Sequence, residues 1–267
     1  MIYLEQSPSA MLQPWVRSLW YCRAPAVPHR RERVLPNGCM QVIVSLTRSS
    51  LTDCGADGTA TSAIPRAIVV GARGRYEVID TSDLDELVGI AFRAGGFARV
   101  FRERADLFFE QSIELDGVWP SAEILERVSA AATPAEKLVI LDSLLCERLD
   151  PKARRCATVE QALHLFRGKE LRIGECARAI GLSERRLSQV FREEVGVGPK
   201  MWCRIRRFQF AVTALHQGAE VPWAELALAC GYYDQSHFAN DFRAFSGIDP
   251  STYSALRSRW HNHVPML

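Results

Sequence analysis

The chain has 267 residues, 48% of them hydrophobic and 24% charged, with a formal net charge of +2. This length suits one large domain or two ordinary domains with packed cores, and the composition favours a soluble globular protein. Apolar runs such as Ala67–Val70 are far shorter than the ~20 residues of a membrane-spanning helix, and the segment Met1–Val16 lacks the features of a secretory signal. We therefore expect a cytoplasmic protein that does not enter a membrane.

Short β-type runs separated by turn signals occupy the chain from Trp15 to Arg93. No long helical periodicity interrupts them, and several short strands at such spacing predict a small antiparallel barrel or sandwich. The candidate strands are Ser18–Arg23, Arg33–Leu35, Met40–Leu46, Ala67–Val70, Tyr76–Ile79 and Leu87–Phe92.

Helical spacing of apolar residues begins after Gly95-Gly96. The predicted helices are Phe97–Arg104, Ser121–Ala131 and Pro134–Leu149, the last with Thr133 as its N-cap. This last helix carries a leucine stripe made of Leu138, Leu141, Leu144, Leu145 and Leu149. The stripe either packs on the sheet of its own domain or forms a homodimer contact through residues 120–149, and the pattern alone leaves both alternatives open.

No enzymatic site is indicated in the first 150 residues. A metal-dependent oxygenase of barrel type needs two or three histidines and a carboxylate, whereas His29 is the one histidine in this half. No Gly-x-Ser-x-Gly nucleophile pattern is present. The eight cysteines form no CxxC pair, and we expect reduced thiols, with Cys22, Cys39 and Cys54 as candidates for a redox role. We predict no metal, no cofactor and no catalytic residue.

A domain boundary is predicted at Asp150–Arg155, where a proline and a basic run end the leucine stripe. Residues 1–150 hold 16 Lys and Arg against 20 Asp and Glu, whereas residues 151–267 hold 17 against 11, so the net charges are −4 and +6. The basic half favours a polyanion as its partner. Its predicted helices are Thr158–Phe166 with Thr158 as cap, Ile173–Ile180, Ser183–Val195, Pro199–Gln217, Pro222–Cys230 and Asp234–Ser246, with no strand between them.

An internal repeat with an offset of about 50 residues relates two parts of this basic half. Each copy has a short helix, a turn at a glycine and a second helix with its own cap, Ser183 in the first copy and Asp234 in the second. This arrangement is typical of a helix-turn-helix motif. The matching residues are Glu175, Ala177, Ala179, Gly181, Phe191, Arg192, Gly196, Pro199 and Trp202 in the first copy and Glu225, Ala227, Ala229, Gly231, Phe242, Arg243, Gly247, Pro250 and Tyr253 in the second.

The second helix of each copy carries polar side chains opposite its apolar face, and such side chains suit the base edges of a DNA major groove. The predicted base-reading residues are Arg185, Ser188 and Gln189 in the first copy and Gln235, Ser236, Ala239 and Asn240 in the second. The predicted phosphate contacts are Arg186, Arg192, Lys200, Arg204, Arg207, His237 and Arg243. The helix Pro199–Gln217 would hold the two motifs at successive major grooves.

The second copy resembles the signature of the AraC/XylS family of bacterial transcription regulators, through Leu226–Phe238, Phe242, Arg243, Gly247, Pro250 and Tyr253. This resemblance covers the last 110 residues or so and implies an all-helical DNA-binding domain with two helix-turn-helix motifs. Asn240 and Asp249 depart from the residues that are common in the family. The first half is similar to an accessory domain found in a subset of these regulators, through Trp15–Arg17, Leu35–Cys39 and Gly89–Gly96. Such domains are cupin-like, and they sense effectors or dimerise.

We therefore predict an α+β protein. Residues 1–149 form a β-rich barrel or sandwich with packed helices that senses an effector or dimerises, residues 150–157 are a linker, and residues 158–267 are an all-α DNA-binding domain. The predicted function is regulation of transcription by sequence-specific binding of double-stranded DNA, controlled by an unknown small-molecule effector or by dimerisation, with RNA polymerase as a further partner. The alternative is a regulator fused to an enzymatic or thiol-reactive first domain.

Overall fold

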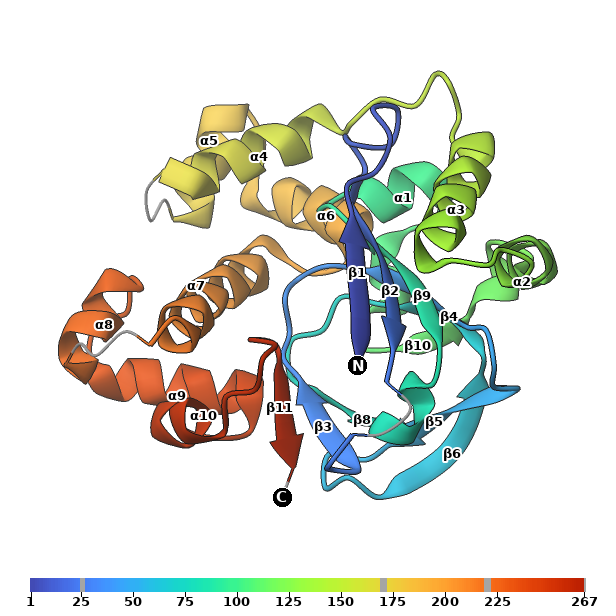
Figure 1. Cartoon of the computed structure of the whole chain (residues 1–267). Coiled ribbons are helices and arrows are strands. Elements are labelled where there is room, and N and C mark those ends of the chain that lie inside the picture. Colours follow the sequence, from blue (N-terminus) through green and yellow to red (C-terminus); the bar gives the residue numbers. More distant parts are fainter. Residues whose placement is uncertain (25–26, 169–171, 219–221, 267) are drawn as a thin grey trace.

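The structure is a computed structural model that describes residues 1–24, 27–168, 172–218 and 222–266. A β-rich first half lies beside a helical second half (Figure 1). The strands are β1 (Ile2–Gln6), β2 (Val16–Arg23), β3 (Arg31–Val34), β4 (Gln41–Ser45), β5 (Ser50–Cys54), β6 (Ala60–Pro65), β7 (Ala67–Val70), β8 (Glu77–Asp80), β9 (Leu87–Phe92), β10 (Ser112–Glu114) and β11 (His263–Met266). The α-helices are α1 (Gly96–Phe101), α2 (Ser121–Ser129), α3 (Pro134–Arg148), α4 (Ala157–Gly168), α5 (Ile173–Ile180), α6 (Glu184–Val195), α7 (Pro199–His216), α8 (Trp223–Ala229), α9 (Gln235–Ser246) and α10 (Pro250–Leu256).

The β-rich half contains a six-stranded antiparallel sheet in the order β1-β2-β9-β4-β7-β10. A second sheet has the order β11-β3-β8, and β5 pairs with β6 as a hairpin. Three short 3₁₀ turns, η1 (Thr81–Leu84), η2 (Ala105–Phe108) and η3 (Leu115–Gly117), complete this half. The predicted fold class, a β-rich first half with packed helices followed by a helical second half, is confirmed.

Strand β2 separates two environments because successive side chains of a strand point to opposite faces. Leu19 and Tyr21 pack into the large core with the helices, whereas Ser18, Trp20 and Cys22 face the interior between the sheets. Gly89 on the neighbouring strand β9 makes room for the Trp20 ring, since a Cβ atom at this position would lie 2.2 Å from that ring. The interior face of the sheet is therefore lined by mixed polar and apolar side chains.

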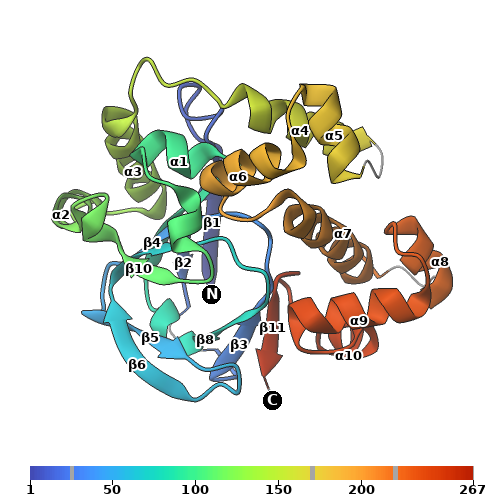
Figure 2. The ribbon, with the colours of Figure 1, turned by 180° about the vertical axis from the view of Figure 1, so that it is seen from behind.

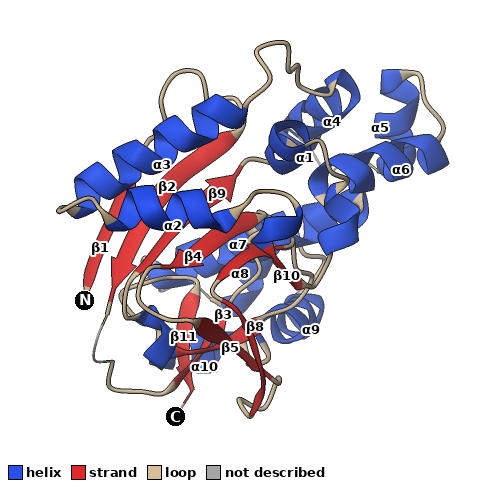
Figure 3. Ribbon diagram, turned by 90° about the vertical axis from the view of Figure 1, so that its right-hand side faces the viewer, coloured by secondary structure: helices blue, strands red, loops and turns tan. Residues whose placement is uncertain are grey.

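Helices α2 and α3 cover the outer face of the six-stranded sheet (Figure 3). The predicted N-cap of α3 is confirmed, because the Thr133 hydroxyl accepts from the Glu136 amide and the Glu136 carboxylate accepts from the Thr133 amide. All the leucines of the stripe are buried, and they belong to the core that contains β2 and β9. The stripe thus packs on the sheet of its own half, and a homodimer through residues 120–149 stays a prediction.

The helical second half contains the two predicted helix-turn-helix units, α5–α6 and α8–α9, joined by the 18-residue helix α7. Both predicted caps form: Ser183 Oγ accepts from the Arg186 amide at 3.2 Å, and Asp234 Oδ1 accepts from the His237 amide at 2.7 Å. The turn of the second unit passes through Gly231 at φ +78°, a left-handed conformation that favours glycine. Figure 2 shows these helices from the opposite side.

Several elements differ from the sequence-based expectations. Thr158 lies inside α4, which begins one residue earlier, so it is not the cap. Strands β1, β5, β6, β10 and β11 and helix α10 were not expected. The largest departure is β11. The sequence predicted an all-helical second half, but His263–Met266 pair antiparallel with β3 of the first half. The two halves therefore share a sheet (Figure 1).

Candidate nucleic-acid interface

The first candidate reading helix is α6. Its inner face is apolar, with Leu187, Phe191 and Val195 buried, whereas Arg185 and Gln189 are exposed and Ser188 is half-buried. Gln189 already makes two side-chain hydrogen bonds, one from Arg186 at 3.2 Å and one to Glu193 at 3.0 Å. The three predicted base-reading residues of this copy lie on one helix, as the repeat implied, and their contact with bases stays a prediction.

The second candidate reading helix is α9. Gln235, Ser236 and Asn240 are exposed and Ala239 is half-buried, whereas Phe238, Phe242 and Phe245 are buried on the opposite side. The predicted phosphate residue His237 is exposed and its ring lies 5.2 Å from the ring of Tyr232, edge to face. This helix therefore presents small polar groups outward from an aromatic anchor, which is a surface that can enter a groove.

The predicted phosphate contacts fall into two structural groups. Arg186, Arg192, Lys200 and Arg243 are exposed. Arg204 and Arg207 are half-buried: the Arg204 guanidinium forms an ion pair with Asp241, and Arg207 Nη1 donates to the Gly231 carbonyl at 3.1 Å. The assignment of all these cations to phosphates stays a prediction, but Arg204 and Arg207 have partners inside the protein.

Separate aromatic clusters hold the two candidate reading helices, α6 and α9, on the connector α7. In the first unit the Phe191 ring lies 6.0 Å from the Trp202 ring and 6.1 Å from the Phe166 ring. In the second unit Phe242 lies 5.1 Å from Phe208 and 5.7 Å from Tyr253. Trp202 and Phe208 both belong to α7, so the positions of α6 and α9 both depend on one connector.

The β-rich half contacts α6 directly. The Arg99 side chain of α1 forms a two-pronged ion pair with Glu194 of α6, in which Arg99 Nε donates to Glu194 Oε2 at 2.9 Å. Burial raises the pKa of the Glu194 carboxyl, and the charge and hydrogen bond of Arg99 offset part of this effect. Arg104 lies 3.6 Å from Glu193 in the same region. The orientation of α6 is therefore coupled to the first half.

The second helix-turn-helix unit is also tied to the first half. The Tyr76 amide donates to the Phe245 carbonyl at the end of α9 at 2.7 Å. Strand β11, which follows α10, pairs with β3, and His263 Nδ1 lies 3.0 Å from Glu32 Oε2. Burial alone would raise the pKa of Glu32, but the hydrogen bonds and charges of His263 and His29 outweigh burial and lower it. Helices α6 and α9 thus both contact the β-rich half.

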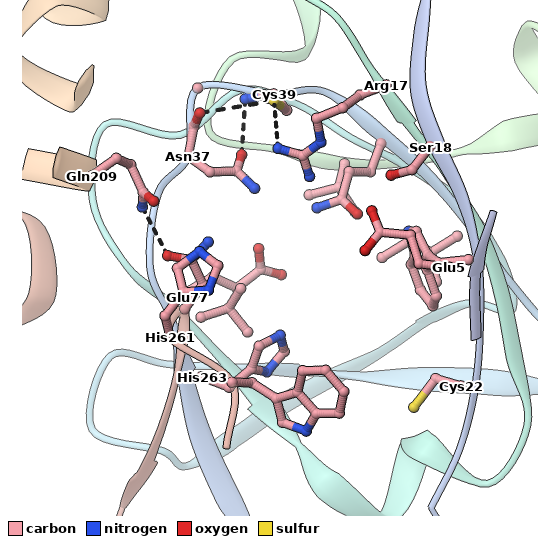
Figure 4. Close-up of a pocket in the computed structure, with 18 of the residues that line it drawn as sticks. Glu5, Arg17, Ser18, Cys22, Asn37, Cys39, Glu77, Gln209, His261 and His263 are labelled. Carbon is pink, nitrogen blue, oxygen red and sulfur yellow. Dashed lines mark hydrogen bonds between the residues drawn. The ribbon is translucent and has the colours of Figure 1, made fainter. Parts of the chain in front are cut away.

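A cavity of about 1150 Å³ lies between the sheets and the helical half (Figure 4). Its apolar wall comes from the β-rich half, through Trp20, Cys22, Ile43, Leu51, Ile64, Ile68, Val70, Leu84 and Leu87. Its polar side includes Arg17, Asn37 and Cys39 of the first half and Arg206, Gln209, His261 and His263 of the second. The buried hydroxyl of Ser18 faces this space, and none of the described residues hydrogen-bonds to it. A molecule in the cavity would touch both halves.

Cys22, Cys39 and Cys54, the candidates for a redox role, form no disulfide. Burial raises the pKa of Cys22 to about 11 and also raises the pKa values of Cys39 and Cys54, which lowers the fraction of reactive thiolate. Across the described ranges, no group of three or more His, Cys, Asp or Glu side chains converges as a metal site. No helix in the described parts of the chain has the length and apolar composition that a bilayer crossing requires.

Sequence reasoning missed the cavity, the ion pair between Arg99 and Glu194, and the pairing of β11 with β3. Each involves residues far apart in the sequence, so local periodicity contains no signal for it. One local signal existed for β11, since His263 and Val264 begin a short run that contains a β-branched residue, but Pro265 interrupts that run.

Two protein-family models match the chain. Residues 176–255 match a helix-turn-helix domain, and residues 4–114 match a domain of unknown function (DUF6597). The helix-turn-helix match spans most of α5 to α10, and the other spans the sheets of the first half. A helix-turn-helix domain in the second half is thus confirmed, while the predicted domain bounds and the cupin-like character of the first half stay predictions.

The chain is also similar to individual proteins. A probable transcriptional regulator, LumQ of Photobacterium leiognathi, is 22% identical over 116 residues, which are 43% of this chain and 44% of that protein. This chain therefore matches less than half the length of that relative. A structure of a probable AraC family transcriptional regulator from Rhodopseudomonas palustris is 26% identical, covers 38% of this chain and 96% of its own, and has a TM-score of 0.34. The structure of unsaturated fatty acid bound ToxT from Vibrio cholerae is 11% identical, covers 94% of each chain, and has a TM-score of 0.45.

Proposed function

We propose that this chain is a DNA-binding transcription regulator of the AraC type and that it binds double-stranded DNA with α6 and α9 in two successive major grooves. The observation that carries this proposal is the pair of capped helices with exposed polar faces at the two ends of one connector. The 18 residues of α7 extend ~27 Å at ~1.5 Å per residue, and successive grooves on one side of a duplex are ~34 Å apart.

We assign the proposed roles from the positions of the side chains on α6, α7 and α9. Arg185, Ser188 and Gln189 read bases in one groove, and Gln235, Ser236, Ala239 and Asn240 read bases in the other. The exposed cations Arg186, Arg192, Lys200 and Arg243, with His237, approach the phosphates and supply affinity that does not depend on sequence. The protein acts in the cytoplasm and influences RNA polymerase at the promoters that it binds.

A selection from a random DNA library with the full chain tests this function. We expect two blocks of preferred bases about one helical turn, roughly 10 base pairs, apart. Arg185→Ala should weaken the preference at one base pair of one block and leave the other block intact. Enrichment of a single block, or no enrichment at all, would refute two-groove binding.

The second part of the proposal is control by a small molecule in the interdomain cavity. The cavity has an apolar wall in the first half and polar groups from both halves, so it suits an amphipathic organic molecule. Because α7 contributes Trp202, Arg206 and Gln209 to the lining of the cavity, an occupant would contact the connector that holds both reading helices. Occupancy would therefore change how α6 and α9 are presented to DNA.

Thermal-shift screening of the full chain against organic molecules tests the cavity. Ile43→Trp fills space beside the apolar wall, and Met11→Trp is a matched control on an exposed residue. A ligand of the cavity should raise the melting temperature of the wild-type chain and of Met11→Trp but not that of Ile43→Trp. Equal shifts in all three chains would place the ligand elsewhere.

A further inference from the structure

An unusual carboxylate lies on the inner side of the second reading helix. Asp241 of α9 sits next to the anchor residue Phe242, and its side chain is only 7% exposed. A carboxylate at such a position is costly unless a cation and hydrogen bonds compensate it. The compensating group is Arg204 of α7, whose Nη2 pairs with Asp241 Oδ1 and whose Nε lies 3.5 Å from Asp241 Oδ2.

The Arg204 guanidinium is constrained on a second side. Its central carbon lies 5.0 Å from the ring centroid of Phe245, another buried residue of α9, within the range of a cation–π contact. Arg204 therefore contacts two residues of α9 that are four positions apart, one by charge and one by its planar face. These contacts favour one rotation of α9 about its own axis over others, because an ion pair with two nitrogens is directional.

Arg207, three residues further along α7, contacts the turn that precedes α9. Its Nη1 donates to the Gly231 carbonyl at 3.1 Å, and its central carbon lies 5.2 Å from the Tyr232 ring. Residues three apart lie on the same side of a helix. The side of α7 that faces the second unit thus contacts both the turn and the reading helix through charged groups.

The first helix-turn-helix unit lacks this arrangement. In the repeat, Phe191 matches Phe242, so the position equivalent to Asp241 is Val190, which is half-buried and packs against the apolar core. Aromatic packing of Phe191 on Trp202 holds α6 instead, together with the ion pair of Glu194 to Arg99. The charged contact between connector and reading helix is therefore specific to the second unit within the described residues.

We infer that Arg204 and Asp241 are positioning residues that set the rotation of α9 on α7, and hence which bases the second unit reads, rather than DNA contacts themselves. This inference rests on the proposed two-groove binding. It revises the role of Arg204, which the charge pattern assigned to phosphate. A phosphate contact would have to use Nη1, which the contacts with Asp241 do not involve, or else leave Asp241 as an uncompensated buried carboxylate.

The test is a double-mutant cycle on the full chain with Asp241→Asn, Arg204→Gln and the double variant, measured for affinity and for base preference by library selection. A positioning pair predicts that each single variant weakens binding about 10- to 100-fold, and that the double variant loses no more than the worse single variant. Base preference should fade in the block read by α9 and persist in the block read by α6.

A phosphate contact gives the opposite pattern. Asp241→Asn would then bind as tightly as the wild type or more tightly, because it removes a negative charge, and Arg204→Gln would lower the slope of log affinity against log salt by about 0.9. That pattern would overturn the inference. Arg243→Gln is the matched control: this exposed cation of α9 should lower the salt slope and weaken both blocks equally.

One further measurement and one further variant distinguish a loss of folding from a loss of positioning. Thermal unfolding is recorded for every variant, and Arg204→Lys keeps the charge but not the planar, two-nitrogen contact. A positioning role predicts that Arg204→Lys folds and still loses preference in the α9 block. Full preference in that variant would overturn the inference, whereas a wild-type chain without any preferred bases would overturn the proposed function as well.

Discussion

Glu32 is the residue whose replacement should most clearly report the docking of the last strand. Its side chain is 9% exposed, and its carboxylate oxygens lie 2.5 Å from His29 Nε2 and 3.0 Å from His263 Nδ1. The carboxylate therefore links β3 to β11. A hydrogen bond to a charged group contributes ~1.5–3 kcal/mol, and a neutral one ~0.5–1.5 kcal/mol. Glu32→Gln keeps the shape but replaces two charged hydrogen bonds by one neutral hydrogen bond, so we expect a loss of about 2–5 kcal/mol in the free energy of unfolding.

The stabilisation by Glu32 should depend on pH in a defined direction. The pKa of Glu32 is lowered in the folded protein, so its contribution is fully present above the ordinary glutamate pKa of ~4.3 and is lost as the pH falls through the lower, folded value. The difference in unfolding free energy between the wild type and Glu32→Gln should thus be present at about pH 5.5 and shrink below about pH 4.

Urea unfolding of both chains across this pH range is the assay. Taking the difference removes the contribution of neighbouring Asp80, whose pKa is also lowered in the folded protein, against the effect of burial, by hydrogen bonds from Ser82 and by Arg31. A difference below about 0.5 kcal/mol at pH 7, or one that does not change on acidification, would refute the assigned role of this carboxylate.

Three further outcomes are expected. Arg185→Ala should cost about 1–3 kcal/mol of discrimination at one base pair, and Gln189→Ala should cost less because Gln189 already bonds to Glu193; library selection compares the two variants. Phe242→Ala should destabilise the second unit by about 3–5 kcal/mol, since this buried ring contacts several other rings, and denaturant unfolding with footprinting would show loss of one block only. Lys200→Ala should weaken binding to all sequences alike and lower the salt slope by about 0.9, and a sequence-dependent loss would contradict its assignment to phosphate.

The features that could be predicted from the sequence are those with a local cause. The caps Ser183 and Asp234 act on amides three residues away, and the helix Ile173–Ile180 and the strand Leu87–Phe92 were predicted with the bounds that the structure has. The hairpin β5–β6 was missed because most of its residues are small or polar, and it therefore lacks the regular apolar alternation that identifies a strand.

The candidate DNA-reading faces were also accessible to sequence reasoning, because a repeated 3.6-residue pattern separates the polar from the apolar side of each helix. The role of a single cation could not be predicted from the sequence. Arg204 and Arg192 look alike in the sequence, yet Arg204 faces a buried carboxylate whereas Arg192 is exposed. The difference arises from Asp241, 37 residues away from Arg204.

The sequence by itself determined that two capped helix-turn-helix units follow a β-rich half, because caps, turns and periodicity act within a few residues. Only the tertiary structure decided how these parts are connected. The pairing of β11 with β3, the ion pair of Arg99 with Glu194 and the shared cavity all join segments separated by tens to hundreds of residues. Such contacts depend on how whole elements pack, and no local pattern encodes that packing.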